Sequence, residues 1–135
     1  MNLQKALIAG AVGGVVNAVY GFIMHGMIMG GTYTAQPELF RQDANMMWFP
    51  IISILIGIVG GMIFAKTYSS WKAGVMGGVT FGFWIGLLPF LATFFNPLIF
   101  KGYPYYLAWC TGAILLLGWM VYGAVVATLY KGQAA

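Results

Sequence analysis

The sequence predicts an all-α, polytopic membrane protein with four transmembrane helices, short loops and glycine-mediated helix packing. The first observation is composition: of 135 residues, 61% are hydrophobic and 6% are charged, whereas an ordinary soluble domain carries about 25% charged residues. The second is the grouping of apolar residues into four blocks, each with the length of about 20 residues that a membrane-spanning helix needs. The third is a glycine at every fourth position of the third block, which places these glycines on one helix face.

We expect a single four-helix domain over residues 1–135, because the four blocks leave little sequence for a separate soluble domain. The predicted helices cover residues 3–29, 46–65, 71–95 and 105–130. Lysines stand singly at the block ends, where they face lipid headgroups and water. The net charge of +4 therefore does not indicate nucleic-acid binding.

The first helix carries a face of glycine and polar residues. One series of residues follows steps of three and four: Gly10, Gly14, Asn17, Gly21 and His25. These residues share one side of the helix and are expected to point into protein. Asn17 falls near the middle of the bilayer, where its amide needs a partner. We expect a hydrogen bond to a neighbouring helix there, in preference to a transport site.

The connection over residues 30–45 is the longest polar stretch and holds both acidic residues of the chain. Within it, Pro37–Arg41 predicts a short helix that lies in the membrane interface, with proline in its first turn. On such a helix Glu38 is expected to pair with Arg41 or Gln42 across one turn.

The second and third helices are expected to be antiparallel neighbours, because residues 66–70 leave room only for a tight turn. The third helix is expected to be the packing hub. Its glycines each lower helix propensity by about 1 kcal/mol, but they let a neighbouring backbone approach closely in lipid. The glycines expected at helix contacts in the first three helices are Gly10, Gly14, Gly57, Gly61, Gly74, Gly78, Gly82 and Gly86.

Pro89 is expected to bend the third helix near its end, because proline removes a backbone donor and frees the carbonyl of Ile85. The polar residue Thr93 follows one turn later. We favour plain packing geometry as the meaning of this bend, and a ligand cavity is the alternative. After a turn at residues 101–104, Tyr105 begins the fourth helix.

Basic residues predict the orientation of the chain. With four spans, one side receives Lys5, Lys66, Lys72 and Lys131, and the other receives Arg41, Lys101 and both acids. Because lysine and arginine favour the cytoplasmic side, we expect both termini in the cytoplasm and a multi-pass location in the inner membrane of the cell.

Two segments of the chain are similar in sequence, residues 11–15 and residues 75–79, and each follows a lysine by a few positions. They fit either a two-plus-two duplication, as in small transporter folds, or chance similarity between glycine-rich helices. The similarity carries no functional claim.

The chain carries no metalloprotease, nucleotide-binding or hydrolase motif. With one His, one Cys and two acids, it cannot supply a multi-ligand metal site or an ordinary triad, so neither an enzyme acting alone nor a required cofactor is expected. His25, near the outer boundary of the hydrocarbon, is expected to bond Tyr33, Glu38 or a headgroup. The alternatives are an axial ligand to a haem or chlorin and a proton-binding group on a conduction path. Cys110 is expected to pack.

The segment over residues 25–47 resembles part of a type of small bacterial four-helix integral membrane protein. The shared pattern is His25-Gly26 at the end of the first helix, then a tyrosine, then an acidic residue leading into an aromatic-Arg pair. No activity is assigned to that type, so the resemblance implies a fold and no catalysis. It also implies a cluster on the outer face made of His25, Tyr33, Glu38 and Arg41.

Three classes of function remain. The first is a non-catalytic accessory or structural subunit of a larger membrane complex, at a cofactor-rich interface, which 17% aromatic residues and nine methionines suit. The second is a small homo-oligomeric transporter or channel, lined by Asn17, His25, Pro89 and Thr93. The third is a membrane redox partner with a borrowed cofactor. Expected partners are membrane lipids and either further copies of the chain or other subunits.

Overall fold

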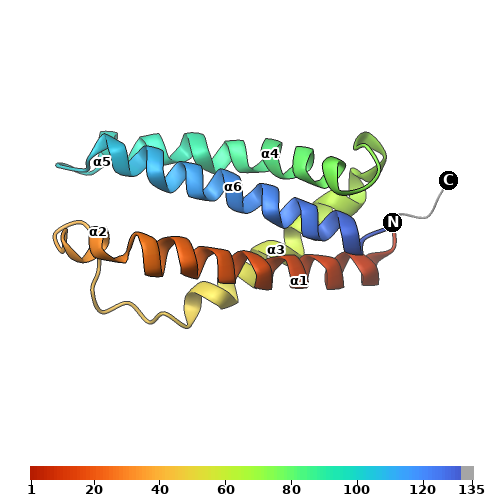
Figure 1. Ribbon diagram of the computed structural model, residues 1–135, viewed down its shortest axis with the longest axis horizontal. Helices are drawn as coiled ribbons and strands as arrows, with labels where there is room; N and C mark the ends of the chain where they lie inside the picture. Colours follow the sequence, from red (N-terminus) through yellow and green to blue (C-terminus); the bar gives the residue numbers. More distant parts are fainter. Residues whose placement is uncertain (132–135) are drawn as a thin grey trace.

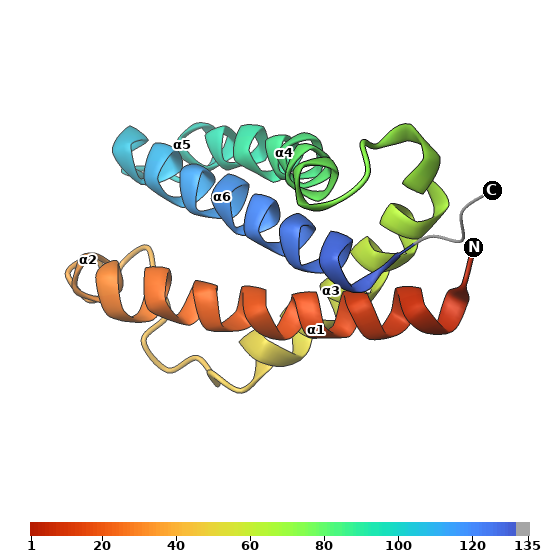
Figure 2. The ribbon, with the colours of Figure 1, turned by 45° about the vertical axis from the view of Figure 1, so that its right-hand side comes forward.

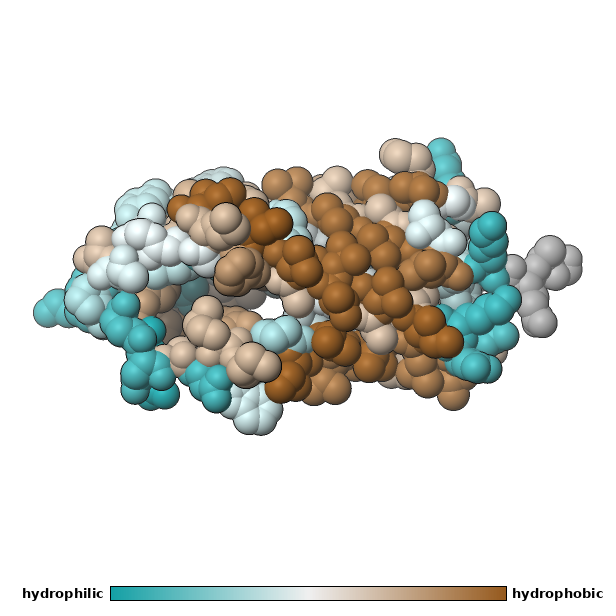
Figure 3. All heavy atoms as spheres, turned by 60° about the horizontal axis from the view of Figure 1, so that its bottom comes forward, coloured by the Kyte–Doolittle hydropathy of each residue, from teal (hydrophilic) through white to brown (hydrophobic). Residues whose placement is uncertain are grey.

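The computed structural model describes residues 1–131, and these are all helix or loop. Four helical segments are long and apolar enough to cross a membrane, as the sequence predicts. They are Leu3–Ile28, Trp48–Lys66, Val75–Ile99 and Tyr105–Leu129. In the space-filling view hydrophobic residues cover the middle of the molecule and hydrophilic residues gather at its two ends (Figure 3). The fold therefore fits a multi-pass membrane protein.

The first span consists of two helical forms. Helix α1 covers Leu3–Gly21 and begins at Asn2, whose side-chain oxygen accepts the backbone N–H of Lys5 at 3.0 Å. At Phe22–Ile28 the helix widens to a π-helix, η1, and a short helix α2 follows at Gly30–Thr34. The π-helix contains His25 and was not expected from the sequence.

The predicted interfacial helix at Pro37–Arg41 is wrong, because this segment forms a single turn. The backbone N–H groups of Leu39 and Phe40 both donate to the carbonyl of Gln36, each at 3.1 Å, and no further turn follows. A short isolated helix gains too few hydrogen bonds to offset the cost of nucleation. Helix α3 covers Trp48–Lys66. Just before it, the side-chain oxygen of Asn45 accepts the backbone N–H of Met47 at 3.0 Å.

Helix α4 covers Val75–Ala92 and starts later than the predicted residue 71. Gly74 precedes it with φ of +84°, a conformation that other residues rarely adopt, so the chain reverses there. A Cβ built on Gly74 would meet nothing within 4 Å. Gly74 is therefore outside the helix and is not part of a glycine contact face, contrary to the prediction.

The α-helix continues through Pro89 to Ala92, and the last part of the third span is tighter. A 3-10 turn, η3, covers Thr93–Phe95, and a short helix α5 follows at Asn96–Ile99. Helix α6, Tyr105–Leu129, returns along the molecule after Pro104, whose extended backbone ends the connection. A bend at Pro89 itself stays a prediction.

Helices α3 and α4 are not antiparallel neighbours along their length, which corrects the prediction. Instead α1 packs on α3 and on α6, while α4 packs on α6 (Figures 1 and 2). The 3-10 turn η2 at Tyr68–Ser70 and the extended Trp71 lengthen the α3–α4 connection. Helices α3 and α4 approach each other beside it, where the rings of Phe64 and Phe81 are 5.1 Å apart.

Both main helix pairs approach closely at glycines. A Cβ built on Gly14 would lie 2.7 Å from Cα of Ile54, between α1 and α3. Between α4 and α6, a Cβ built on Gly82 would overlap the carbonyl oxygen of Trp119, and one on Gly78 would overlap that of Gly123. These positions leave no room for a side chain.

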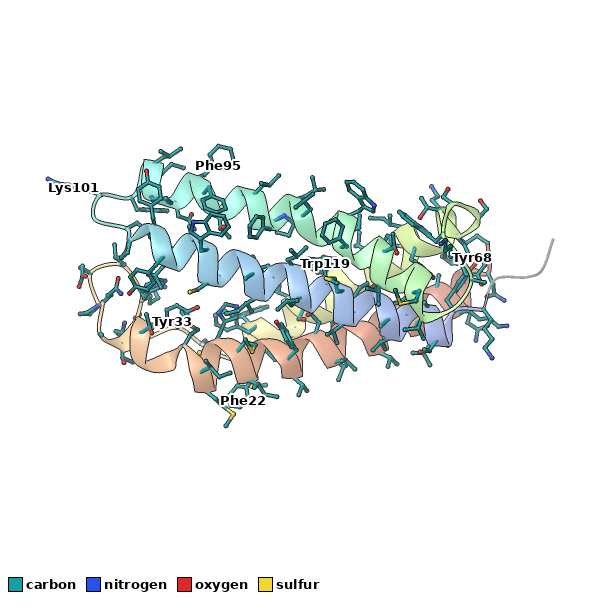
Figure 4. The ribbon with its side chains drawn as sticks, turned by 45° about the horizontal axis from the view of Figure 1, so that its top comes forward. Phe22, Tyr33, Tyr68, Phe95, Lys101 and Trp119 are labelled. Carbon is teal, nitrogen blue, oxygen red and sulfur yellow. The ribbon has the colours of Figure 1, made fainter. Side chains whose placement is uncertain are left out.

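One end of the molecule, called here the lysine end, collects the chain positions of Lys5, Lys66, Lys72 and Lys131 (Figure 1). There the N–H of Asn2 donates to the hydroxyl of Tyr130 at 3.2 Å, so the first and last described helices meet. The opposite end, called the loop end, holds the connection from Gly30 to Met47 and Lys101 (Figure 4). The main buried cluster lies toward the lysine end and consists of Ala6, Ala9, Phe64, Ala65, Phe81, Tyr122, Val126, Ala127 and Tyr130.

Candidate functional site

At the loop end the structure brings His25 and Tyr33 together. Nδ1 of His25 lies 2.6 Å from the hydroxyl oxygen of Tyr33, and the two rings stack with centroids 5.9 Å apart. Both residues are half-buried. The π-helix carries His25 and the turn into α2 carries Tyr33 back over it, so two consecutive local elements build the contact.

The Tyr33 hydroxyl keeps its proton at neutral pH. Burial, followed by the neighbouring Tyr103 and Cys110, raises the pKa of Tyr33 from 10.0 to about 12. The phenol therefore has a proton to donate to Nδ1 of His25. In that arrangement the imidazole carries its own proton on Nε2, which is the ring nitrogen left for any further contact.

The other two members of the predicted cluster do not join this pair. The described ion pair links Nε of Arg41 to a carboxylate oxygen of Asp43 at 3.5 Å, and both side chains are largely exposed. Exposed pairs of this kind contribute little to stability. The predicted pairing of Glu38 with Arg41 or Gln42 is wrong, because the segment does not form the helix that would bring them side by side. The side chain of Gln42 donates instead to the carbonyl of Phe40 at 2.6 Å.

Two aromatic rings complete the surroundings of Tyr33. Phe40 packs on it with centroids 4.7 Å apart, and Tyr103 packs on Phe40 at 6.3 Å. In addition, the amide of Gln36 donates to the hydroxyl of Tyr106 at 3.0 Å. These contacts join the connection after α2 to the start of α6. No spacing rule relates residues so far apart in the chain, so sequence reasoning missed them.

The predicted intramembrane residues Asn17, Pro89 and Thr93 do not converge on one site. Among residues 1–131 the Asn17 amide has no hydrogen bond to a neighbouring helix, which corrects that prediction. Its oxygen instead lies against Gly118 of α6, 2.9 Å from the position that a Cβ atom would take there. Thr93 is buried, with 7% of its surface exposed. Its hydroxyl lies 2.9 Å from the carbonyl oxygen of Ala108, so it links η3 to α6.

Three further hydroxyl groups bond backbone carbonyls of a neighbouring helix. Tyr20 donates to Ile114 at 3.1 Å, Ser53 donates to Gly14 at 3.0 Å, and Tyr122 donates to Gly57 at 2.5 Å. These bonds join α1 to α6, α3 to α1 and α6 to α3, and Thr93 adds a link from η3 to α6. Sequence reasoning singled out Thr93 and missed the others, since a hydroxyl in an apolar block gives no periodic signal.

Metal binding has little support in the described part of the chain. Within residues 1–131 no three His, Cys, Asp or Glu side chains gather where an ion would fit. Cys110 is exposed, which corrects the expectation that it packs. The remaining alternative, a single axial bond from His25 to a haem or chlorin, would use Nε2 in the other tautomer, in which Nδ1–H donates to the Tyr33 hydroxyl oxygen, and it stays a prediction.

Burial is divided unevenly between the two ends. None of the residues from Val15 to Ile56 is buried, and this stretch, called here the open half, includes the second part of α1, all of η1 and α2, and the start of α3. The loop-end parts of α4, η3 and α6 differ, because they contain buried residues: Gly86, Thr93, Leu107, Ala108, Gly112 and Ile114. The space-filling view shows the surface hollowed in the half nearer the loop end (Figure 3).

A comparison of the chain with known protein families, with curated proteins and with solved structures found no match. The functional argument therefore rests on the geometry of the chain itself.

Proposed function

We propose that the protein is a non-catalytic accessory or structural subunit of a larger complex in the inner membrane of the cell. The observation that carries the proposal is the open half, in which no residue from Val15 to Ile56 is buried. A helix that faces lipid on one side still buries its other side against protein. Here even the residues of the first span that face the bundle, such as Tyr20 of α1 and Met24 of η1, are half-buried at most.

The side chains of the open half suit contact with another protein. Phe22, Met27, Trp48 and Phe49 are all more than half exposed. Aromatic residues and methionine are enriched at protein interfaces, where their large surfaces adapt to a partner. A partner polypeptide that filled the hollow would give α1 and α3 the packing that α4 and α6 already have.

Two finer features belong to this proposal. The glycines at the α1–α3 and α4–α6 contacts are proposed to determine the close packing of each pair, since a bulkier residue would separate the backbones. The lysine end is proposed to face the cytoplasm, with both termini, because lysines concentrate on that side of membrane proteins.

The structure of a single chain supports the alternative function, a transporter or channel, less well than it supports the subunit role. Thr93 of η3 is buried against α6, and its hydroxyl donates to the carbonyl of Ala108 in α6. The groove along α6 that crosses the middle of the molecule is lined almost wholly by apolar side chains. The expected lining residues thus do not form a polar path.

Isolation of the protein from its native membranes in mild detergent, followed by native mass spectrometry, tests the proposal. An assembly with other polypeptides in fixed stoichiometry is expected, and a visible absorption band would add the cofactor-rich interface. A colourless homo-oligomer would favour the transporter instead. A monomer that carries only lipid would contradict the proposal.

A further inference from the structure

A groove runs along one face of α6 between α1 and α4. Its volume is about 490 Å³. The floor is a helical stripe on α6, and the walls come from Tyr20 of α1, Met24 of η1 and Val79 of α4. The floor residues are Leu117, Met120, Val121 and Ala124. The one polar group of this lining, the Tyr20 hydroxyl, already donates to the carbonyl of Ile114. The groove therefore offers an occupant only apolar contact.

The groove points along α6 toward a concentration of positive charge. Helix α6 ends at Leu129, and Lys131 follows it directly. On the wall, Val79 lies in the second turn of α4, and Lys72 precedes that helix. Both lysines are exposed, as are Lys5 and Lys66 at the same end. The two acidic residues of the chain, Glu38 and Asp43, lie at the opposite end, so no acidic side chain balances these lysines.

We propose that this groove and the lysines beyond it bind one anionic phospholipid, with an acyl chain along α6 and the phosphate at Lys72 and Lys131. The lengths agree. At about 1.5 Å of rise per residue, Ala124 and Leu117 lie about 10 Å and about 21 Å from Lys131 along the helix axis. One leaflet consists of about 15 Å of hydrocarbon below about 5–7 Å of headgroup region, where the lysines are expected to lie. Ala124 thus lies within the hydrocarbon of this leaflet and Leu117 lies near the middle of the bilayer, which is the depth range of an acyl chain.

The charge of the lysines and the shape of the groove together favour an anionic phospholipid over other occupants. Lysines near a membrane surface attract anionic lipid by about 1 kcal/mol each, which a zwitterionic phospholipid does not match. A free phosphate ion would use the lysines and leave the groove empty, whereas a partner helix would use the groove and leave the lysines without a counter-charge. The inference does not depend on the proposed subunit role, because it is argued from the groove and the lysines alone. Of the open half, the groove includes only Tyr20 and Met24.

The test uses the full chain in mild detergent, with phosphatidylglycerol added, and phosphatidylcholine of the same acyl chains in a parallel sample. Native mass spectrometry counts retained lipid, and thermal unfolding measures stabilisation. Phosphatidylglycerol should be retained and should raise the Tm, and phosphatidylcholine should do neither. In the double variant Lys72→Gln/Lys131→Gln, retention should fall about 30-fold, which corresponds to about 2 kcal/mol. The control Lys101→Gln, at the loop end, should behave as wild type.

A second pair of variants tests the groove. Val121 is 39% exposed on the groove floor, and Val121→Trp should fill the space and abolish retention. The control Leu88→Trp places the same ring on an exposed position of α4 outside the groove lining and should retain the lipid. If Val121→Trp lowers the Tm without lipid, Ala124→Leu provides the same test with a smaller change. Equal retention of both lipids, stabilisation by inorganic phosphate alone, or full retention in the filled groove would overturn the proposal.

Discussion

The substitution Gly82→Ala tests whether the close approach of α4 and α6 depends on glycine. Gly82 is buried in the middle of α4. A Cβ at this position would overlap the carbonyl oxygen of Trp119 and would lie 2.8 Å from Cα of Met120. Both neighbours are backbone atoms of α6, so no flexible side chain can move aside. The two helices would have to separate.

The expected magnitude follows from two opposed effects. Replacing glycine by alanine inside a helix adds about 1 kcal/mol of helix propensity. Inserting a methyl group into a filled contact usually lowers stability by about 1–3 kcal/mol, and backbone neighbours place Gly82 at the upper end of that range. We expect Gly82→Ala to lower the free energy of unfolding by about 1–2 kcal/mol. Gly82→Leu should lower it further and reduce the yield of folded protein.

Gly21 provides the matched control. It is the last residue of α1, and a Cβ built on it would meet nothing within 4 Å. Gly21→Ala should therefore leave stability unchanged or raise it by up to about 1 kcal/mol. Denaturant titration in detergent micelles, with helix content followed by circular dichroism, measures both variants. If Gly82→Ala is as stable as Gly21→Ala, the close contact between α4 and α6 does not depend on glycine.

Three other predictions concern single side chains and topology. Tyr122→Phe removes the donor to the Gly57 carbonyl and should lower unfolding free energy by about 1 kcal/mol in the same titration; no change would show the bond to be dispensable. The raised pKa of Tyr33 means that the unfolded chain loses this proton first, so its contribution to stability is full below pH 10 and is lost as pH approaches 12. Tyr33→Phe should remove that part of the alkaline loss, and an unchanged pH profile would contradict it. In intact cells, an impermeant thiol reagent should label Lys101→Cys and spare Lys66→Cys, both in a Cys110→Ala background; the reverse pattern would invert the topology.

Composition and hydropathy predict the helices because each block must satisfy its backbone within the membrane by itself. The bounds differ where local geometry intervenes. Gly74 adopts a positive φ at the end of the connection, so α4 begins only after it and not at residue 71. The π-helix at Phe22–Ile28 depends on how the chain turns into α2, which apolar periodicity does not record.

The arrangement of the helices was harder to predict than their number. The short connection between α3 and α4 predicted that these two helices would pack against each other. The most extensive contacts instead join α1 to α3 and α4 to α6. Glycine spacing marks which face can approach another helix and leaves the partner unspecified. The contact of His25 with Tyr33 was expected because both lie near one boundary within a few residues. Phe40 and Tyr103 were not expected beside them, since only the folded connection brings them there.

Site-specific photo-crosslinking in native membranes tests the central claim most directly. A photoreactive residue at Phe22, which is 63% exposed in the open half, is compared with one at Leu91, which is 55% exposed on the packed α4. The account predicts that position 22 crosslinks to one defined polypeptide in fixed yield and that position 91 crosslinks mainly to lipid. If both positions give only lipid adducts in native membranes, the open half is covered by lipid, and the protein is not the subunit proposed.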